Sequence, residues 1–329
     1  MKMESVTEIK EKEKRPLIIL TGPTAVGKTQ LSIALAKAVG GEIISADSMQ
    51  VYRGMDIGSA KISQKEMEGI PHYLIDVLDP REEFNVVRFQ SMAMEAMERI
   101  YAGGHIPVVV GGTGFYIQAL LYGIDFTQPE EEGEEGVYRK SLEALAEEKG
   151  NQYLYDLLKE QDPEYAAENH PNNRKRMIRA LEYIYLTGRK FSSYNQEQRG
   201  RESPYRFAYF VLTMDRVRLY ERINLRVDQM LARGLLEEVE RLKAMGCKKG
   251  MTSMQGLGYK EMLDYLEGNL TFEQASELLK RDTRRFAKRQ LTWFRRERDV
   301  IWLNKEEYSG QEELLKDMLE RIEQRCGIR

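Results

Sequence analysis

The sequence has little cysteine, little histidine and no long apolar run. Cys247 and Cys326 are the only cysteines among 329 residues, which excludes a disulfide framework and fits a reducing compartment. No apolar run approaches the ~18 residues that a membrane-spanning helix needs, and the charged first residues are unlike a secretory signal, so we expect a cytoplasmic protein. The three histidines, His72, His105 and His170, are scattered and predict no zinc cluster.

The chain also lacks an excess of charge of either sign. It carries 50 Lys and Arg against 53 Asp and Glu, a net charge of -3, which excludes a uniformly basic coat for nucleic acid. Hydrophobic residues at 42% and charged residues at 31% are typical of a soluble globular protein. The chain is longer than a domain with a single hydrophobic core usually is, so we expect two domains or one domain with an insertion.

Short apolar runs alternate with helical patterns at the start of the chain. Strands are predicted at 16–21, 42–47 and 72–78, and residues 106–114 are predicted as a further strand that enters a glycine turn. Helices are predicted between them, one of which begins near Lys28. This order predicts an α/β fold with a doubly wound parallel sheet and right-handed crossovers.

The pattern changes near Gln128. Residues 128–136 are acidic and contain glycine, which predicts a solvated linker, and residues 137–200 read as helices. A strand is predicted again at 206–215, and the remainder reads mostly as helix. We therefore predict a core made of residues 1–128 and 205–329, interrupted by a helical insertion at 129–204.

The segment from Gly22 to Thr29 matches the P-loop pattern GxxxxGK[ST] in full. An apolar strand precedes it and a helix follows it, as a phosphate cradle requires. The glycines let backbone N–H groups approach phosphate oxygens, and the helix N-terminus adds a favourable dipole. Lys28 is predicted to reach the phosphates and the Thr29 hydroxyl to bind Mg²⁺. The pattern is usual for ATP or GTP, although the cradle itself recognises only a diphosphate.

Asp47 ends the second predicted strand, at the sheet edge that carries the P-loop. A carboxylate there can take a proton from a nucleophile or hold Mg²⁺ through water, but Asp-Ser also suits a turn or a helix cap. Residues 111–114, with the sequence GGTG, repeat the strand-to-glycine turn. They predict either a second loop that faces the substrate or the start of a helix.

Two basic clusters stand out in this acidic chain. Residues 280–298 place cations along one side of a helix and aromatic residues between them, and residues 174–179 form the second cluster. Each alone is most simply a solvated helix face. Together with a P-loop they indicate a long polyanion as partner. The helix after the resumed strand carries Arg216, Arg222 and Arg226, one of which could clamp a phosphate.

These motifs, in this order, closely resemble one family, the bacterial-type tRNA dimethylallyltransferases, also called tRNA isopentenyltransferases. The resemblance rests on segments that span nearly the whole chain: GPTAVGKT, ISADSMQVYRGMDIGSAK, PHYLIDVLDP, GGTGFYIQALLYG, HPNNRKRMIRALE, LYERINLRVDQMLARGLLEEV, GLGYKEM and AKRQLTWFRR. It implies a P-loop core of the nucleoside-kinase type with a helical insertion. It also implies a monomeric, Mg²⁺-dependent, cytoplasmic prenyltransferase that moves a dimethylallyl group from dimethylallyl diphosphate to N6 of adenosine 37 in tRNAs reading codons that begin with U.

The resemblance also assigns roles to residues. Asp47 would be the base, with Thr24 and Arg226 as its catalytic partners. Donor binding would fall to the whole P-loop, Gly22, Pro23, Thr24, Ala25, Val26, Gly27, Lys28 and Thr29, with Thr29 as the metal ligand. The residues that would contact tRNA are Asp47, Ser48, Met49, Gln50, Thr113, Arg139, Lys175, Arg176, Met177, Ile178, Arg179, Gln255, Gly256, Leu257, Gly258, Tyr259, Lys260, Lys288, Arg289, Gln290 and Arg295.

Two other functions compete with this one. A small-molecule P-loop kinase would use Asp47 toward a hydroxyl and would have no use for the basic clusters. A nucleotide-dependent RNA-binding switch would need a base-selective motif such as NKxD, which the sequence lacks.

Overall fold

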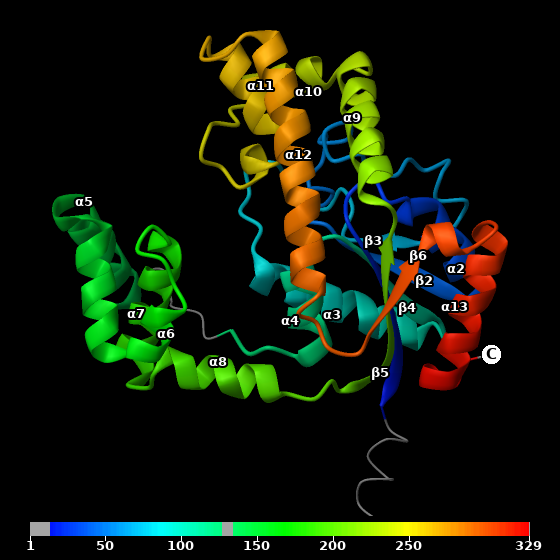
Figure 1. Cartoon of the computed structure of the whole chain (residues 1–329), viewed down its shortest axis with the longest axis horizontal. Helices are drawn as coiled ribbons and strands as arrows, with labels where there is room; N and C mark the ends of the chain where they lie inside the picture. The colour runs from blue at the N-terminus through cyan, green and yellow to red at the C-terminus, as the bar shows by residue number, and fades with distance from the viewer. Residues whose placement is uncertain (1–13, 127–133, 329) are drawn as a thin grey trace, which may run out of the picture. The chain divides into compact units, whose positions relative to one another are not determined.

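A six-stranded, entirely parallel sheet forms the core of the protein. The computed structural model describes residues 14–126 and 134–328. The strands lie in the order β3-β2-β4-β1-β5-β6. Figure 1 shows the sheet with the helices that pack around it. Their bounds are β1 Arg15–Thr21, β2 Gly41–Ala46, β3 His72–Tyr73, β4 Ile106–Gly111, β5 Tyr205–Thr213 and β6 Val300–Asn304. Parallel pairing throughout confirms the predicted doubly wound α/β class.

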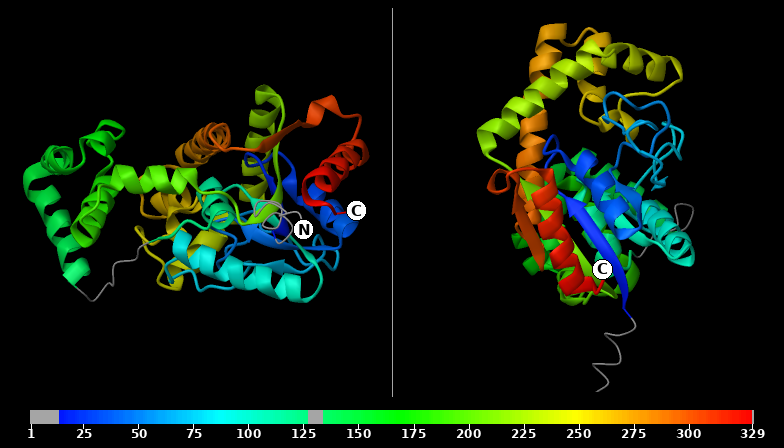
Figure 2. Two further views of the ribbon diagram at one scale, coloured as in Figure 1. Left: turned by 90° about the horizontal axis from the view of Figure 1, so that it is seen from below. Right: turned by 90° about the vertical axis from the view of Figure 1, so that its right-hand side faces the viewer.

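Helices cover both faces of this sheet. On one face, alternate strand residues such as Ile18, Leu20 and Phe210 pack under α2 (Lys28–Val39) and α13 (Gln311–Cys326). These two helices lie side by side in Figures 1 and 2. Because side chains alternate along a strand, the residues between them face the other way, where α3 (Val86–Ala102) contacts β2 and β4. Both cysteines are buried and free.

Four further helices rise from the carboxyl ends of the strands. They are α9 (Arg216–Ala232), α10 (Leu235–Ala244), α11 (Tyr259–Leu266) and α12 (Phe272–Phe294). The α12 helix, orange in Figure 1, begins with a capping box between Thr271 and Gln274 and packs against α9. A shorter helix, α4 (Gly114–Tyr122), follows β4. None of the described helices has the length and apolar character needed to span a bilayer.

The chain divides into two compact units, one of residues 1–121 and 204–329 and the other of residues 122–203. The second unit is helical, with α5 (Glu134–Gln161), α6 (Pro163–Ala167), α7 (Arg174–Thr187) and α8 (Phe191–Gly200). It has its own core, to which Leu142, Leu158 and Leu181 belong. The predicted boundary at 128/129 and most of the predicted acidic linker fall on residues 127–133, which lie outside the described residues.

One predicted strand was too long, and one strand of the sheet was not predicted. The strand expected at 72–78 is only His72–Tyr73, because Leu74 and Asp76 have positive φ angles of 63° and 54°, which no strand accommodates. The region after Arg216 was expected to be mostly helix, yet Val300–Asn304 forms β6, which pairs with β5 at the sheet edge. This missed strand brings a C-terminal segment next to the P-loop.

Candidate active site

The P-loop joins β1 to α2 as the sequence predicts. Gly22 and Gly27 have φ angles of 144° and 96°, a region that favours glycine. At Gly22 a Cβ would also lie 2.5 Å from the carbonyl oxygen of Leu212, so the neighbouring strand leaves no room for a side chain. Lys28 Nζ donates to the carbonyl oxygens of Gly22 and Pro23 at 2.9 and 3.0 Å. The loop therefore closes over its own lysine.

A cavity of about 410 Å³ lies above the P-loop, at the carboxyl ends of β1, β2 and β4. This is the crevice in which doubly wound sheets bind ligands. It brings together many of the residues predicted from the sequence: Thr24, Ala25, Gly27, Lys28, Thr29, Asp47, Gln50, Arg226 and Gln290. Asp47 is the only carboxylate among the described residues that line it. Ile43, Ile62, Ile75 and Val110 give the same cavity an apolar portion.

Asp47 serves as a turn former with one oxygen only. Its Oδ1 accepts from the backbone N–H of Met49 at 2.8 Å and of Gln50 at 3.4 Å, an Asx turn. No hydrogen bond from a described residue is made to Oδ2. The two roles proposed for Asp47 are therefore compatible, because the turn fixes the side chain and leaves a carboxylate oxygen for chemistry.

Cations face this carboxylate. Burial lowers the pKa of Lys28 to about 8, with the nearby Arg226 adding to the effect and Asp47 opposing it. Burial also lowers the pKa of Arg226, while Asp47 raises it. Arg226 makes no hydrogen bond or ion pair with any described residue. Arg222 adds to the lowering of the Arg226 pKa. Half-buried cations that disfavour one another in this way form a site suited to an anion.

Gln290 lines the cavity and has a structural role there, and its predicted contact with tRNA stays a prediction. Its side chain is buried, its Oε1 accepts from the Thr24 N–H at 2.9 Å, and its Nε2 donates to the Gly112 carbonyl at 2.9 Å. A Cβ on Gly112 would lie 2.2 Å from that Nε2, so only glycine allows this approach. Gln290 therefore ties α12 to both glycine loops and positions the cavity wall.

Three more of the predicted tRNA contacts are core residues. Met177 and Ile178 are buried in the helical unit, and Tyr259 is fully buried. Their side chains have almost no exposed surface, which explains them as packing residues, and their predicted contacts with tRNA stay predictions. Their neighbours Lys175 and Arg176 are exposed, as is Gln255, whereas Lys260 lies within ion-pair distance of Glu261 and Asp282.

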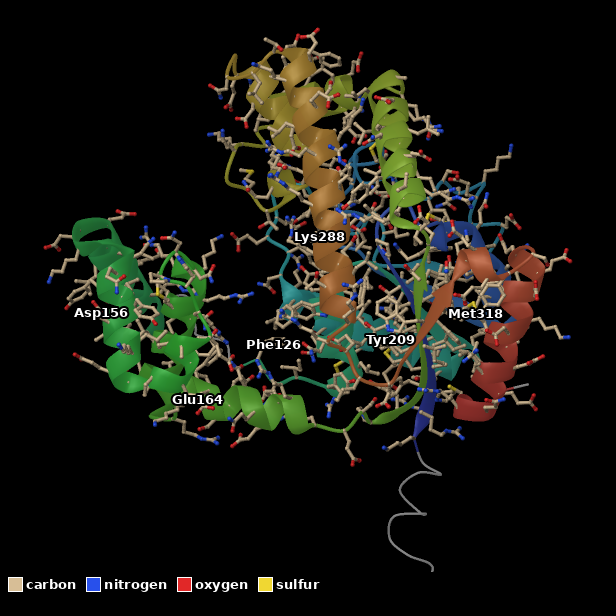
Figure 3. The ribbon with its side chains drawn as sticks, in the orientation of Figure 1. Phe126, Asp156, Glu164, Tyr209, Lys288 and Met318 are labelled. Atoms are coloured by element: carbon tan, nitrogen blue, oxygen red, sulfur yellow. The ribbon has the colours of Figure 1, made fainter. Side chains whose placement is uncertain are left out.

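Among the remaining predicted tRNA contacts, Gly256 and Gly258 are buried and Leu257 is partly exposed. Ser48, Met49 and Thr113 are partly exposed beside the cavity. Lys288, which Figure 3 labels, and Arg289 are exposed on α12, and Arg295 is exposed directly after that helix. A second hollow of about 380 Å³ lies along this helix, lined by Arg285, Lys288, Arg289, Thr292, Trp293 and Arg296.

On the helical unit, Arg139 is part of an ion pair and Arg179 is half-buried. The Arg139 guanidinium donates to both carboxylate oxygens of the buried Glu182, at 2.7 and 2.8 Å. A structural pairing of this kind explains Arg139 without RNA, so its predicted contact with tRNA stays a prediction.

Sequence reasoning missed two functional candidates, Glu238 and Lys305. Glu238 holds the loop at 56–58, and Lys305 lies against the P-loop directly after β6. Lys305 lies in none of the segments that carry the resemblance, and Glu238 lies within one of them, LYERINLRVDQMLARGLLEEV, but was assigned no role. The one available signal was the short run of apolar residues from Val300 to Leu303, which indicates a strand and therefore a following turn at the same edge of the sheet as the P-loop.

The fold and the cavity together define a P-loop protein of the group-transfer class, with a phosphate cradle that faces one carboxylate. A family model described as IPP transferase matches residues 50–297, and one described as isopentenyl transferase matches residues 16–80. A tRNA dimethylallyltransferase of Lachnoclostridium phytofermentans is 60% identical over 305 residues, 93% of this chain and 96% of that protein. The chain belongs to the IPP transferase family.

Solved structures agree with this assignment. A tRNA isopentenylpyrophosphate transferase from Bacillus halodurans is 44% identical, with a TM-score of 0.70 over 96% of this chain and 99% of that one. The corresponding Staphylococcus epidermidis enzyme is also 44% identical, with a TM-score of 0.69 over 95% and 100%. A eukaryotic dimethylallyltransferase acting on tRNA is 33% identical, with a TM-score of 0.76 over 88% and 74%. The predicted resemblance and fold are confirmed.

Proposed function

We propose that this protein is a tRNA prenyltransferase that moves a dimethylallyl group from dimethylallyl diphosphate to N6 of adenosine 37, in tRNAs reading codons that begin with U. The observation that carries the proposal is the phosphate cradle whose cavity contains one carboxylate, Asp47, with an oxygen left over from its turn. Family membership supplies the reaction class, and the geometry supplies a role for each group.

The acceptor is a poor nucleophile because the N6 lone pair is delocalised into the adenine ring. In the proposed reaction the N6–H proton passes to Asp47 Oδ2, the C–N bond forms, and the allylic C–O bond breaks with its electron pair going to diphosphate. Thr24 lies in the same cavity, where its hydroxyl would position the donor and the amine. The target base would have to leave the anticodon-loop stack to reach the cavity.

The departing diphosphate gathers negative charge. Lys28, Arg226 and the loop N–H groups would stabilise this charge as it develops in the transition state. Preorganised charges contribute most to the rate of a reaction when they act on such developing charge. The apolar portion of the cavity suits the five-carbon chain of the donor and limits the water that could intercept an allylic cation.

Magnesium is part of the proposal. Mg²⁺ in phosphate sites uses one or two protein oxygens together with phosphates and waters. The Thr29 hydroxyl at the start of α2 fits this requirement, and no described group of three or more His, Cys, Asp or Glu offers a separate metal site. The ion would neutralise charge on the diphosphate when it binds.

The tRNA would be held by cations, which fix register on the phosphate backbone but do not read sequence. The basic hollow along α12 and the exposed Lys175 and Arg176 of the helical unit are the candidates. We further propose that the protein acts as a monomer in the cytoplasm.

The test is incubation of purified protein with Mg²⁺, dimethylallyl diphosphate and unmodified tRNA, followed by mass spectrometry of adenosine 37. We expect dimethylallyl-adenosine to form equally with and without ATP. A requirement for ATP, or turnover of ATP with no prenylation, would favour a small-molecule kinase instead.

The pH dependence should report Lys28. Because its pKa is lowered to about 8, the free protein loses this positive charge as pH rises through about 8, so kcat/KM for the donor should fall on the alkaline side. Bound diphosphate favours the ammonium form, so kcat at saturating donor should hold to higher pH. Steady-state rates across pH at saturating tRNA measure both, and a flat kcat/KM profile from about pH 7 to about pH 10 would contradict this role.

A further inference from the structure

Lys305 and Arg222 lie at successive carbonyl groups of the P-loop. Arg222 Nε donates to the Ala25 carbonyl oxygen at 2.8 Å, and Lys305 Nζ lies 3.4 Å from the Val26 carbonyl oxygen. A Cβ built on Gly27 would meet both side chains, Lys305 Nζ at 3.0 Å and Arg222 Nη2 at 3.6 Å. Two cations from α9 and from the segment after β6 therefore converge on one turn of the loop.

Nothing among the described residues compensates the charge of Lys305. It makes no ion pair with a described carboxylate, and the adjacent Glu306 pairs with Arg218 at 3.0 Å. Burial and the neighbouring Arg222 both lower the pKa of Lys305. The side chain also sits at the N-terminus of α2, where the helix dipole disfavours a cation. Such an arrangement is unfavourable by itself and becomes favourable when an anion arrives.

The carbonyl groups involved connect these cations to the cradle. The Ala25 carbonyl shares its peptide unit with the Val26 N–H, and the Val26 carbonyl shares its unit with the Gly27 N–H. A cation that binds the oxygen of a peptide unit polarises the N–H at its other end, which makes that N–H a stronger donor. The Gly27 N–H, at the other end of the peptide unit that Lys305 contacts, belongs to the loop that would hold the diphosphate. The Val26 N–H donates to the Pro23 carbonyl oxygen at 3.3 Å, so Arg222 acts on the diphosphate through its charge and through the shape of the loop.

We propose that Lys305, together with Arg222, is a positioning residue for the diphosphate, acting through the P-loop peptides and through its own charge. This rests on the proposed function for the identity of the donor, but the site it concerns is the diphosphate cradle itself. Lys305 lies outside residues 50–297, the segment that the IPP transferase model matches. The predicted ligand is the diphosphate group, whether in the prenyl donor or as free product.

The experiment is isothermal titration calorimetry of inorganic pyrophosphate into the full chain at fixed Mg²⁺, without tRNA. We expect Lys305→Met to weaken pyrophosphate binding about tenfold, and Lys305→Arg to restore most of it because the charge returns. Lys305→Gln keeps a donor for the Val26 carbonyl but no charge, so it should bind as weakly as Lys305→Met. The matched control is Lys316→Met, on the exposed side of α13, which should bind like wild type.

Two outcomes would overturn the inference. One is that Lys305→Met binds pyrophosphate within about twofold of the wild-type affinity. The other is that Lys305→Gln binds pyrophosphate as tightly as wild type, because the role of Lys305 would then be a structural hydrogen bond and not a charge. Thermal unfolding of each variant identifies any variant that does not fold. If Lys305→Met does not fold, the comparison of Lys305→Arg with Lys305→Gln tests the inference. Pyrophosphate binding does not require prenylation, so failure of the tRNA assay with a strong Lys305 effect would reject the proposed function alone. Normal prenylation with no Lys305 effect would reject this inference alone.

Discussion

The Asp47→Asn protein is expected to bind tRNA like wild type and to lose about 10²–10⁴-fold in kcat, the contribution typical of a general base. Asparagine is nearly isosteric and keeps an Oδ1 acceptor for the Met49 and Gln50 N–H groups, so the Asx turn that shapes this loop persists. What is lost is the negative charge and the basic Oδ2. Single-turnover prenylation of tRNA with saturating donor measures the chemical step, and filter binding measures the affinity for tRNA.

The matched control is Asp228→Asn, on the α9 helix that also carries Arg226. Asp228 is exposed, pairs with Lys280 at 2.8 Å and is not among the residues that line the cavity. Its rate should stay near wild type, since exposed ion pairs contribute little. A loss of only a few-fold for Asp47→Asn would show that the residue forms the turn and does not take the proton.

The part of the site made of consecutive residues could be predicted from the sequence. The P-loop combines a buried strand, glycines at fixed positions and a helix, and each of these is encoded locally. Asp47 could be placed opposite because parallel strands end at the same edge of a sheet. Lys305 could not, since it reaches the P-loop only because β6 joins the sheet beside β5, a pairing between distant segments.

The burial of some residues inside the predicted contact segments has a physical cause as well. A resemblance assigns a role to a run of residues, but a packed helix turns some of the run inward. Lys175 and Arg176 are exposed while Met177 and Ile178, one step further along α7, are core residues. Gln290 is the same case on α12, between the exposed Arg289 and the partly buried Leu291. Burial by neighbouring elements decides these positions, and it follows from the tertiary fold.

The Glu238→Ala protein is expected to be strongly destabilised. The Glu238 carboxylate is buried on α10 and accepts from the backbone N–H groups of Asp56, Ile57 and Gly58 at 2.9–3.2 Å, and from the Tyr259 hydroxyl at 2.8 Å. Alanine leaves these donors without a partner, and each unsatisfied buried donor costs about 1–3 kcal/mol. We therefore expect a loss of about 3–5 kcal/mol in the free energy of unfolding.

Urea unfolding followed by tryptophan fluorescence measures this loss of stability. The signal reports the unfolding of the unit that contains Glu238, because both tryptophans, Trp293 and Trp302, belong to that unit. The control is Glu240→Ala, an exposed position on the same helix, where the urea midpoint should barely move.

The loop that Glu238 holds continues to Ser59, Ala60 and Ile62, and the last two line the cavity. If the only role of Glu238 were to stabilise the packing of its helix, the Glu238→Ala protein, where it still folds, would keep the wild-type KM for the donor. Because it holds a wall of the cavity, we expect that KM to rise, and an unchanged stability would contradict the whole account of this loop.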